Sequence, residues 1–147
     1  MDECIFCKIK EGEIPSACVY EDDIVYAFLD ITQVTPGHTL VIPKEHVQNI
    51  FEYDTKLASE VFSRIPKISQ AIMETFPDAQ GMNIVMNNGE MAYQTVFHSH
   101  IHLLPRYGAE DGFSMTFQNN MESYSQEEFQ QRAQDIHTTI HQRKDDQ

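Results

Sequence analysis

Basic residues are scarce in this sequence. Ten lysines and arginines face 23 aspartates and glutamates, which gives a formal net charge of −13 over 147 residues. Nucleic-acid polymers are bound through basic surfaces, so this balance argues against DNA or RNA as a partner. A single small-molecule nucleotide stays open as a ligand, because backbone amides and a few side chains can hold one phosphate.

Long hydrophobic runs are also missing. No apolar stretch approaches the roughly 20 residues that a membrane-spanning helix needs. The start, Met1-Asp2-Glu3-Cys4, lacks the basic-then-apolar pattern of a secretion signal. We therefore expect a cytoplasmic protein with no membrane partner, and the length suits one domain with its own core.

Cysteine is too rare for a disulfide framework, since there are only three. Cys4 and Cys7 form a C-x-x-C pair, which has three interpretations: half of a metal site, a redox pair, or a turn with two buried thiols. A redox pair is expected beside a βαβ pattern, and none follows. Half of a zinc site needs two more ligands from elsewhere in the chain. Cys18 is expected to be a small apolar residue.

Three histidines alternate with other residues in the segment 97–106, Phe-His-Ser-His-Ile-His-Leu-Leu-Pro-Arg. Side chains of a strand alternate between its faces, so a strand would place His98, His100 and His102 on one face, and Pro105 would mark its end. A helix would scatter the three rings around its axis. A row of neutral imidazoles supplies a nucleophile and proton-transfer partners, or it binds a metal.

The rest of the chain reads as short strands and two helical regions. Strands are predicted at 19–21, 24–29, 39–43 and from 81 to an Asn-Gly turn at 88–89. A helix is predicted from Asp54, its N-cap, to 76, kinked or split at Pro66, and another from Ser125 to Arg143. Further polar candidates flank the strands, and each could bind a ligand or satisfy loop backbone: Asp30, His38, His46, Asn87, Gln94 and Thr95.

Together these motifs resemble the histidine triad (HIT) family, and most closely its bacterial Hint-type branch. The motifs, in family order, are Cys4-Ile-Phe-Cys7-Lys-Ile, Ala27-Phe-Leu-Asp30-Ile, Pro36-Gly-His38-Thr-Leu-Val-Ile-Pro43-Lys, Asn87-Asn-Gly89, Gln94-Thr95-Val and His98-Ser-His100-Ile-His102-Leu-Leu-Pro105-Arg106. The resemblance extends to about Phe113. It implies an α+β, HIT-like fold: an antiparallel sheet with a long kinked helix and a C-terminal helix. The chain is then one HIT domain over 1–147, with a C-terminal extension from about residue 114, and it pairs as a homodimer.

The resemblance also implies an activity, the hydrolysis of adenosine or purine nucleoside phosphoramidates, or of related nucleoside monophosphate esters, through a nucleotidyl-histidine. His100 matches the nucleophile, and the carbonyl of His98 fixes its tautomer. His102 matches the residue that contacts phosphate and assists the leaving group, and His38 matches a fourth histidine beside them. The expected nucleotide contacts are Asp30 to the ribose, Ile31 over the base, Asn87, and Gln94 and Thr95 to phosphate, together with His100 and His102.

No metal is needed for that chemistry. Zinc-carrying relatives, however, use a C-x-x-C pair, a histidine after the strand of 39–43 and the first triad histidine. The resemblance therefore implies a closed, structural zinc site made by Cys4, Cys7, His46 and His98. One departure is Tyr93, because the family usually has glycine immediately before the Gln-Thr pair. A side chain there affects the phosphate loop and the choice of leaving group.

Three other functions compete with this interpretation. The first is hydrolysis of dinucleoside polyphosphates. The second is a metal-dependent hydrolase that uses His98, His100 and His102 as ligands, against which stands the lack of a carboxylate beside the three histidines. The third is a nucleotide sensor without catalysis, against which stand the intact His100 and His102.

Overall fold

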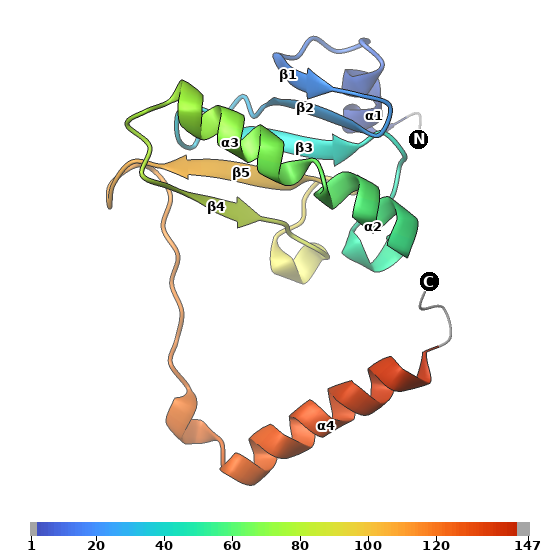
Figure 1. The fold of residues 1–147 in the computed structure, drawn as a ribbon, viewed down its shortest axis with the longest axis vertical. Helices are drawn as coiled ribbons and strands as arrows, with labels where there is room; N and C mark the ends of the chain where they lie inside the picture. Colours follow the sequence, from blue (N-terminus) through green and yellow to red (C-terminus); the bar gives the residue numbers. More distant parts are fainter. Residues whose placement is uncertain (1–2, 144–147) are drawn as a thin grey trace. The chain divides into compact units, whose positions relative to one another are not determined.

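The computed structural model describes residues 3–143, so Met1, Asp2 and residues 144–147 lie outside it (Figure 1). The chain divides into two units, with the boundary between Phe113 and Ser114. The predicted C-terminal extension from about residue 114 begins at this boundary. All the predicted site residues belong to the first unit.

The first unit is built on one five-stranded sheet. Its strands are β1 (Cys18–Glu21), β2 (Val25–Leu29), β3 (Thr39–Pro43), β4 (Gly81–Val85) and β5 (Ile101–Arg106). Their order is β1-β2-β3-β5-β4, and every neighbouring pair is antiparallel. Helices pack on this sheet, so the predicted α+β class is confirmed.

Both faces of the sheet are covered, by different helices. Helices α2 (Thr55–Phe62) and α3 (Ile65–Thr75) cross one face (Figure 1) and enclose Val25, Ala27, Val41, Ile101 and Leu103. Helix α1 (Ile5–Lys10) packs on the other face against Tyr26, Phe28, Leu40 and Ile42. Alternate residues of a strand face opposite sides, so one strand serves two separate cores. This double cover explains why β2 and β3 read as continuous apolar runs.

The long predicted helix is split in two. The Asp54 carboxylate accepts the Leu57 N–H at 2.8 Å, which confirms the predicted N-cap. Helix α2 ends before Ser63 and α3 begins at Ile65, so the break precedes Pro66. In the first turn of α3 the missing proline N–H costs no helical hydrogen bond, which is why the chain breaks there.

The predicted histidine strand is only partly correct. Strand β5 begins at Ile101, so His98 and His100 lie in the irregular segment before it and only His102 is in the strand. The Ser99 N–H donates to the Val47 carbonyl at 2.7 Å, outside any ladder, which diverts this segment from the sheet. The predicted strand end is also wrong. Pro105 lies inside β5, where it pairs with Met82 of β4. Pairing of β5 with β3 stops at Leu103, so the missing N–H of Pro105 costs no hydrogen bond to β3.

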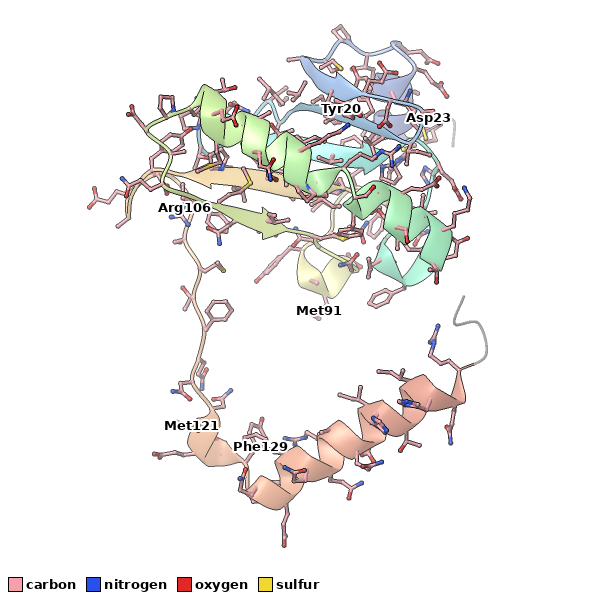
Figure 2. All side chains as sticks on the ribbon, viewed as in Figure 1. Tyr20, Asp23, Met91, Arg106, Met121 and Phe129 are labelled. Carbon is pink, nitrogen blue, oxygen red and sulfur yellow. The ribbon has the colours of Figure 1, made fainter. Side chains whose placement is uncertain are left out.

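The second unit contains α4 (Gln126–Gln142), with Ser125 as N-cap and the predicted capping box with Glu128. No residue of α4 is buried. Met121, from a short 3₁₀ turn, and Phe129 are both exposed (Figure 2). None of the helices in the described residues is long and apolar enough to span a bilayer.

Candidate functional site

The site lies where β2 ends and β3 begins. Asp30 follows β2 and His38 precedes β3, and the Asp30 N–H donates to the His38 carbonyl at 3.0 Å, which extends the β2–β3 pairing. The Gln33 amide donates to the carbonyls of both residues at 2.8 Å and closes the loop between them. Gly37 is required in this loop, because its φ is +92° and an added Cβ would lie 2.8 Å from the Phe76 ring.

His38 and His102 are in direct contact, with 2.9 Å between His38 Nε2 and His102 Nδ1. The Val34 N–H points at His38 Nδ1 at 3.3 Å. Because an amide N–H can only donate, His38 Nδ1 accepts and Nε2 carries the proton in the neutral ring. That proton is donated to His102 Nδ1. The neutral His102 therefore carries its own proton on Nε2.

His100 is held in the opposite tautomer. Its Nδ1 lies 2.8 Å from the His98 carbonyl oxygen, which can only accept, so Nδ1 carries the proton. The lone pair is left on Nε2, away from this bond. The Phe6 ring meets the His100 ring edge-on at 5.0 Å, and the His102 ring lies 5.2 Å away. A neutral nucleophilic nitrogen thus stands beside a ring that presents an N–H.

Burial keeps all four of these histidines neutral at neutral pH. It lowers the pKa of His100 and of His38, and it lowers the pKa of His98 and of His102 to about 4. Burial pushes the pKa of Asp30 upward, but hydrogen bonds from the Thr32 N–H and hydroxyl outweigh it, so the pKa is lowered. Asp30 is therefore an ionised carboxylate, and its Oδ2 lies 3.6 Å from His38 Nε2.

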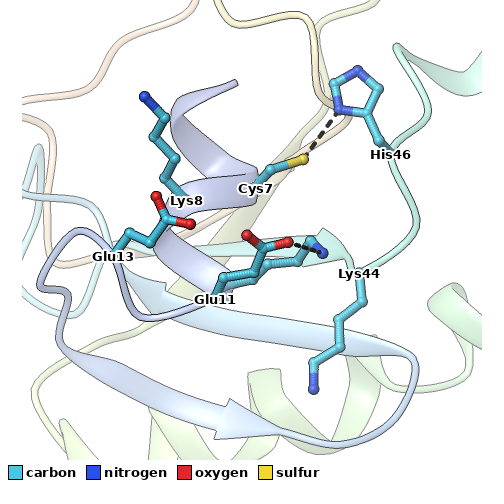
Figure 3. Close-up of a pocket in the computed structure, with 7 residues that line it drawn as sticks. Cys7, Lys8, Glu11, Glu13, Lys44 and His46 are labelled. Carbon is cyan, nitrogen blue, oxygen red and sulfur yellow. Dashed lines mark hydrogen bonds and ion pairs between the residues drawn. The ribbon is translucent and has the colours of Figure 1, made fainter. Parts of the chain in front are cut away.

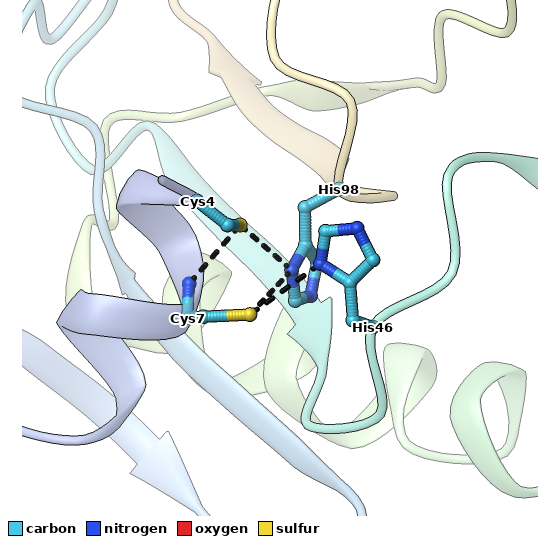
Figure 4. Close-up of side chains that lie close together, drawn as sticks. All are labelled: Cys4, Cys7, His46 and His98. Carbon is cyan, nitrogen blue, oxygen red and sulfur yellow. Dashed lines mark hydrogen bonds between the residues drawn. The ribbon is translucent and has the colours of Figure 1, made fainter. Parts of the chain in front are cut away.

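Cys4, Cys7, His46 and His98 converge from three separate segments (Figure 4). The sulfur-to-Nδ1 distances are 3.4 Å for Cys4–His98, 3.4 Å for Cys7–His46 and 3.6 Å for Cys7–His98. Zinc–sulfur and zinc–nitrogen bonds of about 2.3 and 2.0–2.1 Å at tetrahedral angles would separate these atoms by about 3.6 Å. His98 Nε2 donates to the Pro43 carbonyl at 2.8 Å, which leaves its Nδ1 lone pair toward the sulfurs. The four side chains therefore form a cluster whose ligand atoms have the spacing of a tetrahedral metal site.

A cavity of about 430 Å³ opens beside this cluster and is lined by Cys7 and His46 (Figure 3). Its other walls carry Lys8, Lys10, Lys44, Glu11 and Glu13. Lys10 pairs with Glu11 at 3.4 Å and Lys44 pairs with Glu21 at 2.7 Å. Three lysines and two glutamates line the cavity, and none of His38, His100 and His102 does, so it is separate from the catalytic candidates.

The predicted nucleotide contacts differ in how free their side chains are. Ile31 is 97% exposed on the loop after β2, Thr95 is exposed and Asn87 is partly exposed. Gln94 is 2% exposed, and all four of its side-chain hydrogen bonds go to the protein. Its oxygen accepts from the Gly89 N–H and the Asn49 amide, and its NH₂ donates to the carbonyls of Gln48 and Val96. Gln94 has no side-chain group left for phosphate and instead fixes the loop that presents Thr95.

Tyr93 has a left-handed backbone, with φ 72° and ψ 20°, after a short 3₁₀ helix at Glu90–Ala92. A bulky residue is rare in this region, where glycine is favoured. Its side chain is 83% exposed, and Met91 beside it extends from the same turn (Figure 2). A glycine at this position would adopt the same backbone conformation without strain.

The three triad histidines do not share a metal. The ligand nitrogen of His98 belongs to the Cys4–Cys7 cluster, and the Nδ1 of His100 donates to a carbonyl. The structure does bring a carboxylate close, since ligand atoms of Asp30, His38 and His102 lie within 4.8 Å of one another. His38 Nε2 carries a proton there, however, and a protonated nitrogen cannot ligate.

Several contributing residues were not found from the sequence. The Gln33 side chain bonds the His38 carbonyl, and the Val34 N–H and the Pro43 carbonyl each bond a histidine ring. Each of these bonds involves a backbone group, which no residue pattern reveals. Phe6 lies inside the C-x-x-C motif and could have been suspected from that place. Cys18 was expected as a small apolar residue, but it is exposed because β1 is an edge strand with a bulge beside it.

The HIT domain model matches residues 11–109. Among curated proteins, Protein hit of Bacillus subtilis is 52% identical over 129 residues, covering 88% of each chain. The adenosine 5'-monophosphoramidase hnt1 of Schizosaccharomyces pombe is 37% identical over 112 residues, covering 76% of this chain and 80% of its own.

Solved structures that are similar to this one include the following two. A member of the HIT family of proteins from Bacillus subtilis has a TM-score of 0.89 at 50% identity, covering 92% of this chain and 96% of its own. A Zn-bound histidine triad family protein from Mycobacterium smegmatis has a TM-score of 0.71 at 35% identity, covering 83% of this chain and 88% of its own.

Proposed function

This chain belongs to the HIT family, and from that premise we propose that it hydrolyses purine nucleoside phosphoramidates, or closely related nucleoside monophosphate esters. The observation that carries the proposal is the pair of opposite tautomers at His100 and His102. One ring offers a lone pair, and its neighbour offers an N–H. The relative from Schizosaccharomyces pombe that is named a monophosphoramidase supports this choice of substrate class.

The reaction follows from the two rings. His100 Nε2 attacks the α-phosphorus, a bond forms between nitrogen and phosphorus, and the phosphorus–amine bond breaks. The substrate phosphate brings negative charge, which raises the pKa of His102, so the ring takes a second proton from solvent on Nδ1 and gives its Nε2 proton to the departing amine. The His38 N–H then turns to the Asp30 carboxylate, 3.6 Å away. The Asp30 carboxylate stabilises the charge on His102 and also accepts from the ribose hydroxyls. Water then attacks the phosphorus, the bond to His100 Nε2 breaks, His102 takes the proton of the water, and the nucleoside monophosphate leaves.

The phosphate and base contacts are assigned by exposure and position. Thr95 contacts phosphate, Asn87 contacts the nucleotide, and Ile31 covers the base, which would bury an isoleucine that is now exposed. We assign Gln94 to holding the phosphate loop through its four hydrogen bonds and not to phosphate itself.

We also propose that the Cys4–Cys7–His46–His98 cluster binds one zinc ion. The spacing of its ligand atoms and the Zn-bound relative from Mycobacterium smegmatis support this choice of metal. Four protein ligands leave no open position, so the zinc would be structural and would brace the His98 side chain. The hydrolytic steps involve only protein groups and water.

A covalent intermediate is the decisive test. Wild-type protein is mixed with an adenosine phosphoramidate, quenched rapidly without acid, and measured as intact mass. We expect a nucleotidyl adduct on His100 in the wild type and none in His100→Ala. The variant should keep nucleotide binding within about tenfold, or roughly 1.4 kcal/mol. Near-wild-type turnover by folded His100→Ala would refute the mechanism, and absence of turnover in the wild type would refute the activity.

A further inference from the structure

The segment that carries the nucleophile is fixed by contacts outside the sheet. Ser99 stands between His98, which supplies the orienting carbonyl, and His100, and it is only 1% exposed. Its N–H donates to the Val47 carbonyl at 2.7 Å. Its hydroxyl lies 2.8 Å from the Tyr53 hydroxyl. Two hydrogen bonds thus fix Ser99, which lies between the His98 carbonyl and the His100 ring that this carbonyl orients.

Tyr53 is well placed to act as a rigid support. It lies between a 3₁₀ helix at Ile50–Glu52 and the N-cap of α2, and its ring packs against the core under α2 and α3. The Phe62 ring lies 6.1 Å away. Burial raises the pKa of the phenol, so the hydroxyl stays neutral and available as a hydrogen-bond partner. A hydroxyl left unpaired in such a place is costly, which favours a fixed Tyr53–Ser99 pair.

We propose that Tyr53 is a positioning residue for the nucleophile, acting through Ser99 on the peptide that carries the His98 carbonyl. Fixing this carbonyl keeps the proton of His100 on Nδ1 and its lone pair on Nε2. The part concerning catalysis rests on the proposed phosphoramidase function. The part concerning the tautomer stands on the structure without a substrate.

A matched control exists in the same structural unit. Tyr26 and Ser16 form a second Tyr–Ser hydroxyl pair, at 2.7 Å, and Tyr26 is also buried. Its hydroxyls bond to each other, and Tyr26 reaches the histidine segment only through the shared apolar core that includes Phe6. Tyr53→Phe and Tyr26→Phe each remove one hydroxyl and keep the ring. A general effect of losing a buried hydrogen bond therefore appears in both variants, and a positioning effect appears only in Tyr53→Phe.

The first measurement is the tautomer of His100 by long-range ¹⁵N–¹H NMR on zinc-loaded, substrate-free protein. We expect a single Nδ1–H tautomer in the wild type and in Tyr26→Phe. Tyr53→Phe and Ser99→Ala should each show a mixture with the Nε2–H form. Ser99→Ala is the second variant should Tyr53→Phe fold poorly. An unmixed Nδ1–H tautomer in folded Tyr53→Phe would overturn the proposal.

The second measurement is steady-state hydrolysis of an adenosine phosphoramidate. We expect kcat to fall about tenfold in Tyr53→Phe while KM stays within about twofold, because one hydrogen bond of ordinary strength is lost. The double variant with Ser99→Ala should fall no further, since both changes break the same bond. Equal losses in Tyr53→Phe and Tyr26→Phe would contradict a positioning role. Without turnover in the wild type the proposed function fails, and the NMR result alone decides the proposal about Tyr53.

Discussion

The buried, neutral state of His102 has a measurable cost in acid. Its folded-state pKa of about 4 lies below the ordinary value of 6.5, because the ring is buried and its neighbours His100 and His38 oppose a further positive charge. The unfolded chain binds this proton below about pH 6.5, whereas the folded protein binds it only near pH 4. Stability from this group is therefore complete above pH 6.5 and is lost as the pH falls toward 4.

The size of the effect follows from the displacement. A pKa lowered from 6.5 to about 4 corresponds to at most roughly 3 kcal/mol of unfolding free energy, and solvent screening reduces this because the ring is only partly buried. Small proteins have unfolding free energies of about 5–15 kcal/mol, so this is a large share of the total. The perturbation is His102→Gln, which removes the titrating ring. Its amide oxygen can still accept the proton that His38 Nε2 donates.

The assay is urea unfolding by circular dichroism from about pH 7 to 4.5, with zinc saturating so that the Cys4–Cys7 cluster stays constant. We expect the unfolding free energy of the wild type to fall more steeply with acid than that of His102→Gln, by up to roughly 2 kcal/mol between pH 7 and 4.5. The many carboxylates titrate in both proteins and cancel in the difference. Parallel pH profiles would show that His102 is not held neutral, and would refute its assignment as a buried N–H donor.

Four further outcomes are expected. Gln94→Ala should lower the unfolding free energy by about 1 kcal/mol for each buried group that it leaves unpaired. Thr95→Ala should instead weaken substrate binding with little loss of stability. Calorimetry with substrate titration distinguishes the two variants, and the reverse pattern would return Gln94 to the phosphate. Tyr93→Gly should raise the unfolding free energy by about 1 kcal/mol, because glycine relieves the strain of the positive φ. It should also raise kcat/KM for a bulky-amine phosphoramidate about ten- to two-hundredfold more than for a small-amine one. Equal gains for both substrates would place the Tyr93 ring away from the leaving group. Elemental analysis after zinc dialysis should give one zinc per chain, and a Cys4→Ser/Cys7→Ser double variant with unchanged zinc content would exclude the proposed site. Light scattering should give a dimer, and a monomer at micromolar concentration would contradict the predicted pairing.

Sequence alone was sufficient where local chemistry decides the outcome. The strands at 25–29 and 39–43, the Asp54 and Ser125 caps and the split near Pro66 follow from residue preferences that act within a few positions. The set of chemically interesting residues was also recoverable, because His98, His100 and His102 alternate in a way that few structural roles require. The convergence of Cys4, Cys7, His46 and His98 was predicted through family resemblance.

Tertiary structure decided what each of these residues can do. The alternating histidines suggest one strand. The Ser99 N–H, however, donates to the Val47 carbonyl, and His98 and His100 lie outside the sheet. The proton positions depend on backbone partners far away in sequence: the Pro43 carbonyl for His98 and the Val34 N–H for His38. Gln94 looked like a ligand contact and is instead consumed by four internal bonds. Backbone groups are nearly the same in every residue, so the sequence does not indicate which of them will bond to a given histidine ring. Only the folded chain therefore determines that the lone pair of His100 is on Nε2.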